Sequence, residues 1–233
     1  MIIVFLGFTP SFYLKFMVSE NPFYPIGLPL PHIIHGVILT VWYIFLVIQT
    51  RWITVNKFSI HKSMGRFGAA LALLVVLSTE WVIYLLPSRP AKLAKDINST
   101  VKEIEPDLVQ ILWLDIFMNI LFIAFISIAI LQWKTAHVHK RLMLYSGIVF
   151  LFASVFRLGE KVGNLFNHPV VGFLTVFVIL FLFTSSLLLH DYQKHKKIYP
   201  LSWMCFGLYW LCMVMSFVLQ SSGFGTSFLH NWY

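Results

Sequence analysis

The chain has 233 residues, of which 59% are hydrophobic and only 11% are charged. Soluble domains carry about 25% charged residues, so this composition excludes an ordinary soluble protein and indicates an integral protein of the lipid bilayer. The net charge of +8 would favour nucleic-acid binding in a soluble protein. In a membrane protein, however, basic residues gather in short loops and set the orientation, so we expect no nucleic-acid partner.

Apolar stretches long enough to cross a bilayer follow one another along the chain. A helix rises 1.5 Å per residue, so about 20 apolar residues span the hydrocarbon core. The first stretch has no basic n-region and no cleavage site, and we expect an uncleaved first helix that is clipped at its start. The sequence therefore predicts an all-α bundle of about seven transmembrane helices, forming one domain over residues 1–233, with spans near 2–18, 32–53, 63–86, 108–132, 141–158, 169–190 and 199–220.

The loops between the predicted spans differ in their charge. Those around 51–66, 134–141 and 194–197 hold ten Lys and Arg residues, and Asp191 is the only acid near them. Basic loops stay in the cytoplasm, so we predict a multi-pass protein of the cytoplasmic (inner) membrane with its N-terminus inside and its C-terminus outside. The one long polar segment, 88–107, is then an extracytoplasmic loop.

A short pattern occurs twice in the chain. The third predicted span opens with Ile60-His61-Lys62 and the fifth with Val138-His139-Lys140, and each follows a span that ends in a Gln, Trp and basic cluster. Both hairpins would run the same way through the membrane, which predicts a parallel repeat of spans two–three and four–five. Chance similarity between two apolar hairpins is the alternative.

Polar residues inside the outer halves of the spans are the candidate functional residues. Ionisable groups in hydrocarbon are costly and usually face a partner, a cavity or a ligand. One interpretation is a convergent site for a proton, a metal, a polar headgroup or a quinone. The other is an Asp115–Arg157 ion pair with hydrogen bonds that only hold the helices together. The predicted outer cluster consists of His35, Glu80, Asp115, Asn119, Arg157 and Glu160.

Metal binding is a further interpretation of the outer residues. Imidazole and carboxylate groups suit zinc or iron. The sequence lacks a tight ligand spacing such as His-Glu-x-x-His, so these ligands would have to come from separate helices. The candidate ligands are His35, Glu80, Asp115, Glu160 and His168.

On the inner side, His61 and His139 occupy equivalent places in the proposed repeat. Two histidines on facing helices can ligate a haem iron from both sides, which predicts a b-type haem. The alternative is a pair of interfacial histidines beside Lys62 and Lys140 that contact lipid phosphate or helix-end backbone.

Several short motifs occur in a fixed order over residues 5–160. They resemble those of a family of bacterial polytopic membrane proteins of uncharacterised function, which implies no activity for this chain. The His-Lys-Arg-Leu-Met run is also similar to a helix opening in the di-haem cytochrome b superfamily of ascorbate and ferric reductases. That similarity implies at most one haem, because the fourth span offers Asp115 where a second pair would need a histidine. The motifs are Gly7-Phe8-Thr9-Pro10-Ser11-Phe12-Tyr13, His35-Gly36, Trp42, Gln49-Thr50, His61-Lys62-Ser63-Met64-Gly65-Arg66, His139-Lys140-Arg141-Leu142-Met143 and Ala153-Ser154-Val155-Phe156-Arg157.

Three functional hypotheses follow from the sequence. The first is a haem-b-binding electron-transfer protein with His61 and His139 as axial ligands. The second is a membrane protein that binds or transports a small molecule, a proton or a metal at the outer cluster, a quinone among the candidates. The third is an assembly subunit without chemistry of its own.

Overall fold

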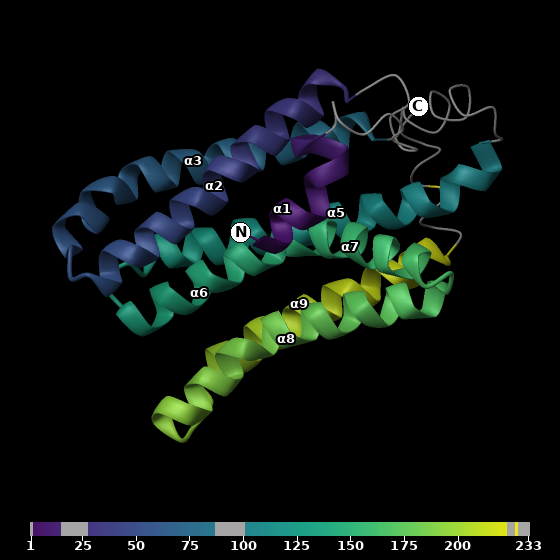
Figure 1. The fold of residues 1–233 in the computed structure, drawn as a ribbon. Helices are drawn as coiled ribbons and strands as arrows, with labels where there is room; N and C mark the ends of the chain where they lie inside the picture. Colours follow the sequence, from purple (N-terminus) through teal and green to yellow (C-terminus); the bar gives the residue numbers. More distant parts are fainter. Residues whose placement is uncertain (1, 15–27, 87–100, 223–226, 228–233) are drawn as a thin grey trace. The chain divides into compact units, whose positions relative to one another are not determined.

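The computed structural model describes residues 2–14, 28–86, 101–222 and 227, and the regular structure in these residues is helical throughout (Figure 1). This confirms the predicted all-α fold. Five segments are long and apolar enough to cross a membrane. They are α2 (Leu30–Thr54), α3 (Phe58–Leu85), the Val109–Leu131 part of α5 (Val101–Leu131), α8 (Pro169–His195) and α9 (Pro200–Gln220).

The predicted span 141–158 is a bent pair of helices. It comprises α6 (Ala136–Val149) and α7 (Leu151–Leu165), which meet at an angle of 40° and together give a sixth candidate span among the described residues. Ser146 and Gly147 precede the bend, and the Ser146 hydroxyl donates to the Met143 carbonyl at 2.8 Å. Gly/Ser pairs and such back-bonding are known causes of helix bending, which accounts for the break.

Two of the sequence-based boundaries differ from the structure or extend beyond the described residues. The first predicted span, 2–18, contains α1 (Ile2–Phe8) and the π-helix η1 (Thr9–Tyr13), and its remainder lies outside the described residues. The predicted loop 88–107 ends in helical residues, because α5 begins at Val101, whereas the candidate span within α5 begins at Val109. The Lys and Glu residues of 101–107 favour a helix, which then runs on into the apolar span. Residues 87–100 lie outside the described part.

The chain divides into two compact units, which we describe separately. The first comprises Met1–Val18 and Ile120–Val214, and the second comprises Ser19–Asn119 and Met215–Tyr233. In the second unit, α2 and α3 form an antiparallel hairpin (Figure 1). A Cβ atom at Gly68 would lie 2.5 Å from Cε1 of the Phe45 ring, so a side chain there would force the ring to move. Near the end of α3 in the same unit, α3 packs on α5 through a core of Ile83, Leu86, Val109, Leu112 and Trp113.

In the first unit, α7 packs closely on α8. A Cβ atom at Gly159 would lie 2.8 Å from the Gly172 carbonyl oxygen, and one at Gly172 would lie 2.6 Å from the Gly159 carbonyl oxygen. Small residues that let backbones approach are typical of helix contacts in membranes. The other side of α7 holds α1, because Lys161 Nζ donates to the Leu6 carbonyl at 2.7 Å and to the Gly7 carbonyl at 3.3 Å. A lysine thus caps the C-terminal carbonyls of α1, which favour a positive charge.

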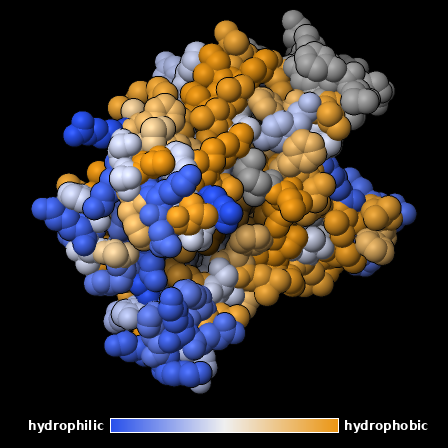
Figure 2. Space-filling model, turned by 60° about the vertical axis from the view of Figure 1, so that its left-hand side comes forward, coloured by the Kyte–Doolittle hydropathy of each residue, from blue (hydrophilic) through white to orange (hydrophobic). Residues whose placement is uncertain are grey.

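Many large apolar side chains lie on the surface of the helices. Figure 2 shows broad hydrophobic areas beside patches of hydrophilic residues. Leu73, Leu77, Leu182 and Val214 are each more than half exposed. Such a surface is unfavourable in water but suits contact with lipid chains, and it supports a polytopic membrane protein.

Candidate intramembrane polar site

The second unit contains four residues of the predicted outer cluster: His35 on α2, Glu80 on α3, and Asp115 and Asn119 on α5. Two of them are in contact, because Asn119 Nδ2 donates a hydrogen bond of 2.6 Å to Glu80 Oε1. Asn119 is only 1% exposed, whereas Glu80 is exposed. The contact therefore joins a buried amide to a carboxyl group that is accessible within a membrane-spanning segment.

His35 is held by a serine on the neighbouring helix. Its Nδ1 atom lies 3.1 Å from Ser78 Oγ, and the Ser78 hydroxyl also lies 3.0 Å from the Val75 carbonyl oxygen. A hydroxyl has one proton, and a carbonyl can only accept. In the His35 tautomer that satisfies both contacts, the Ser78 hydroxyl donates to the Val75 carbonyl and His35 Nδ1–H donates to Ser78 Oγ. This arrangement leaves the His35 Nε2 lone pair available to accept a proton or a hydrogen bond.

These two contacts lie at one depth. Ser78 and Glu80 are two residues apart on α3, which corresponds to a rise of about 3 Å and to nearly opposite sides of the helix. His35 therefore reaches α3 from α2 at almost the level at which Asn119 reaches it from α5. We call His35, Ser78, Glu80 and Asn119 the polar layer.

The polar layer has more acceptors than donors. Asn119 Oδ1 is buried and has no hydrogen-bond partner among the described residues. The Glu80 carboxyl and His35 Nε2 add further acceptor capacity. Asp115 lies one turn before Asn119 on the same face of α5, where it is partly buried. A group that carries a proton is therefore the natural ligand of this layer.

The remaining residues of the outer cluster belong to the first unit. Arg157 Nη1 donates to the Ala153 carbonyl at 2.9 Å, and its guanidinium lies 4.5 Å from the centre of the Phe8 ring. Glu160 is exposed on α7. Because Asp115 and Arg157 are in different units, their ion pair stays a prediction.

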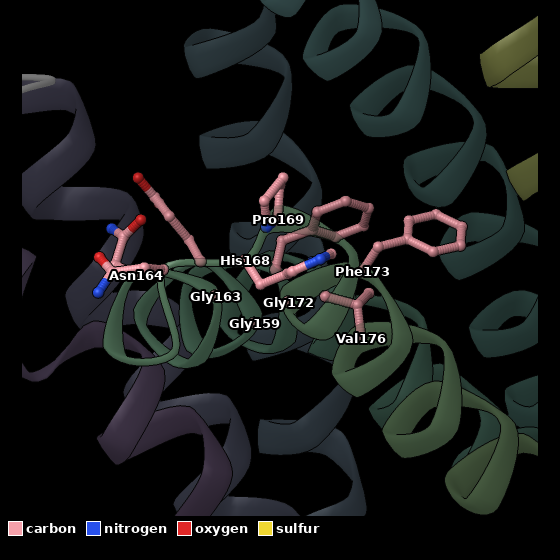
Figure 3. A pocket seen from close by; sticks show the side chains of 11 residues that line it. Gly159, Gly163, Asn164, His168, Pro169, Gly172, Phe173 and Val176 are labelled. Atoms are coloured by element: carbon pink, nitrogen blue, oxygen red, sulfur yellow. The ribbon is translucent and has the colours of Figure 1, made fainter.

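Glu160 and His168 line an open pocket of about 560 Å³ between α7 and α8. Its polar side chains do not converge, since Asn164 points away from His168 and Phe173 in Figure 3. Glu160, Asn164 and His168 are all exposed. We therefore assign no ligand to this pocket. Within the described ranges no group of three or more His, Cys, Asp or Glu residues could hold a metal ion, so the metal interpretation gains no support there.

The two inner histidines have similar local settings. His61 is the fourth residue of α3, and His139 is the fourth residue of α6. The His139 ring is fixed, because its Nδ1 atom lies 2.8 Å from the Ala129 carbonyl oxygen and must donate to it. His61 lies in the second unit and His139 in the first, so their pairing and the wider repeat stay predictions.

A polar cluster that the sequence analysis missed lies in the first unit. Arg141 and Asp191, which the sequence analysis counted as loop charges, are 1% and 0% exposed and form an ion pair between α6 and α8. Ser202 on α9 donates to Asp191 Oδ2 at 2.5 Å and accepts from Arg141 Nε at 3.0 Å. The sequence held one indication of this ion pair, because Asp191 is the single acid near the basic loops.

Helix boundaries explain why this cluster was missed. The predicted span 169–190 stops before Asp191, but α8 continues to His195. The predicted span 141–158 starts at Arg141, but α6 already begins at Ala136. Comparison of the chain with models of protein families, with curated proteins and with solved structures found no match.

Proposed function

We propose that the protein transports protons across the membrane and that Glu80 is its main proton-binding group. The observation that carries this proposal is the hydrogen bond from Asn119 Nδ2 to Glu80 Oε1. It occupies one carboxyl oxygen and leaves Oε2 to gain or lose a proton. A protonated carboxyl still accepts through its carbonyl oxygen, so the Asn119 contact persists in both states.

His35 is the second proton-exchanging group in this proposal. Its Nδ1–H is fixed on Ser78, so a proton would enter at Nε2. His35 and Glu80 lie on α2 and α3 at almost the same depth and on different sides of α3. Intramembrane carboxyl and imidazole groups are the usual elements of proton relays.

The test is proton flux into liposomes that contain the purified full chain and a pH-sensitive dye. An imposed potassium diffusion potential should acidify wild-type liposomes faster than protein-free ones. Glu80→Gln keeps the hydrogen bond with Asn119 but cannot exchange a proton, and it should abolish the difference. Glu160→Gln makes the same change at an exposed carboxyl outside the polar layer and should leave the flux unchanged. A wild-type rate equal to that of empty liposomes, or an unchanged rate in Glu80→Gln, would contradict the proposal.

Haem ligation is the second candidate, with His61 and His139 as axial ligands. The specific support is the Ala129 carbonyl, which accepts from Nδ1 of His139 at 2.8 Å and holds the ring in place. Ligating histidines almost always donate their other ring N–H in this way. Bound haem would supply one-electron transfer. Protein from haem-replete cells should then show a b-type band that His139→Ala abolishes, and colourless protein would refute this candidate.

A further inference from the structure

The first unit has a strongly basic surface at the end where α6 begins and α8 ends. The residues that form it are all exposed. His137, on α6, and His195, on α8, both contact the Tyr199 ring, so the two helices lie close together at this end. We define the basic surface as Lys140, Lys194, His195, Lys196 and Lys197.

Acidic groups do not offset this charge. The sequence of the first unit contains only two acids, Glu160 and Asp191. Glu160 lies towards the far end of α7, beside the turn into α8. Asp191 is fully buried and is neutralised by Arg141, with Ser202 donating to it as well. The exposed charge at this end is therefore entirely positive.

Aromatic side chains place this end at the level of the lipid headgroups. Trp133 and Tyr192 are 56% and 57% exposed. Lys134 Nζ lies 5.5 Å from the centre of the Trp133 ring, and Lys196 Nζ lies 6.0 Å from that of Tyr192. Exposed Trp and Tyr beside lysines are typical of the membrane–water interface. The anions that meet this surface first are thus phosphates of the bilayer rather than soluble polyanions.

Tyr199 fixes part of the surface in place. The Arg141 guanidinium carbon lies 4.0 Å from the centre of the Tyr199 ring, and Lys197 Nζ lies 5.4 Å from it. His137 and His195 contact the same ring at centroid distances of 6.2 and 5.5 Å. The buried Arg141–Asp191 pair thus supports the turn that carries Lys197. Held side chains lose less entropy when they bind, so this geometry favours a specific site.

From these observations we propose that the basic surface binds the phosphate headgroup of an anionic phospholipid. Lys140 and Lys194 would contact the phosphate from two helices, and Lys197 would contact it from the turn. Clusters of basic residues next to membrane-spanning helices attract anionic lipid, and each lysine raises the affinity for such a lipid roughly fivefold. This inference is independent of the proton transport proposed above.

The test is thermal unfolding of the full chain in two kinds of bicelle, one of phosphatidylcholine alone and one that also contains phosphatidylglycerol. Wild-type protein should unfold at a higher temperature in the anionic bicelles. K140Q/K194Q/K197Q should lose most of that increase and bind phosphatidylglycerol roughly a hundredfold more weakly. The matched control is K57Q/K62Q/R66Q, which removes three exposed positive charges from the second unit and should keep the increase.

Three outcomes would overturn the proposal. The first is the absence of any increase in the wild-type protein. The second is an equal loss in both triple variants, which would make the effect one of net charge. The third is an equal increase with inorganic phosphate in phosphatidylcholine bicelles, which would make the ligand a free anion. Circular dichroism of the variants at low temperature should show the wild-type helix content, since all six side chains are exposed.

Discussion

Arg141 and Asp191 form a buried, two-point ion pair that links α6 to α8. Arg141 Nη2 donates to Asp191 Oδ1, and Nε lies 3.2 Å from Oδ2. The third guanidinium nitrogen, Nη1, donates to the His137 carbonyl at 2.8 Å. With Ser202 bound to the same carboxylate, this pair joins three helices at one point.

Replacing Arg141 with methionine should lower the stability of the protein strongly. The substitution leaves the Asp191 carboxylate buried without its cation, and breaking such pairs costs about 3–5 kcal/mol. The measurement is equilibrium unfolding in detergent. R141M/D191L should recover most of the loss, because two apolar side chains of similar volume leave no uncompensated charge. If R141M unfolds like the wild type, the pair does not stabilise the fold.

Gly172→Ala should destabilise the contact between α7 and α8. The added Cβ would meet the Gly159 carbonyl oxygen at 2.6 Å, and a backbone atom cannot move aside without shifting a helix. We expect a loss of about 1–3 kcal/mol, as for other overpacked sites. Gly207→Ala is the control, since no atom beyond the neighbouring backbone of its own helix lies within 4 Å of its Cβ position. Equal melting temperatures for the two variants would contradict the packing described for α7 and α8.

Glu80 and Asn119 should show coupled effects on stability. Hydrogen bonds between membrane helices contribute about 0.6 kcal/mol on average and at most about 1.7 kcal/mol. A double-mutant cycle with E80A and N119A should give a coupling energy within this range. The comparison cycle of E80A with K62A should be additive, because Lys62 lies 18 residues earlier on α3, or about 27 Å away. An additive result for both cycles would remove the contact on which the polar layer depends.

The predicted topology places Tyr233 outside the cytoplasm. The described residues supply up to six spans, and the stretch 2–18 is the predicted seventh. An odd number of spans with the basic loops inside gives an external C-terminus. A reporter that is active only in the cytoplasm should therefore be silent when fused after Tyr233. Activity of that fusion would show that the span number or the orientation is wrong.

Span length was sufficient to predict most of the helices, but not where each one ends. Apolar length identifies the part of a helix in hydrocarbon, and α8 passes beyond that part to His195. Polar residues at the interface continue the backbone hydrogen bonds, so no compositional change marks the true end. The bend between α6 and α7 was also missed, although Ser146 and Gly147 precede it.

Side-chain partners were harder to predict than helices. The depths of Glu80 and Asn119 in their predicted spans placed both residues in one outer cluster. The hydrogen bond between them, however, depends on how α3 and α5 are rotated about their axes. The serine that holds His35 lies in an apolar run, where it resembles a small core residue. Arg141 and Asp191 are 50 residues apart, and their burial depends on helices that continue past the apolar spans.

The contact of Lys161 with α1 has a consequence for biogenesis. Lys161 follows Leu6 by 155 residues, so the lysine that caps α1 leaves the ribosome long after α1 itself. At synthesis rates of about 5–20 residues per second, the delay is roughly 10–30 s. During that interval α1 has neither its cap nor its packing partner α7. The α1 segment therefore reaches its final place only after α7 has been made.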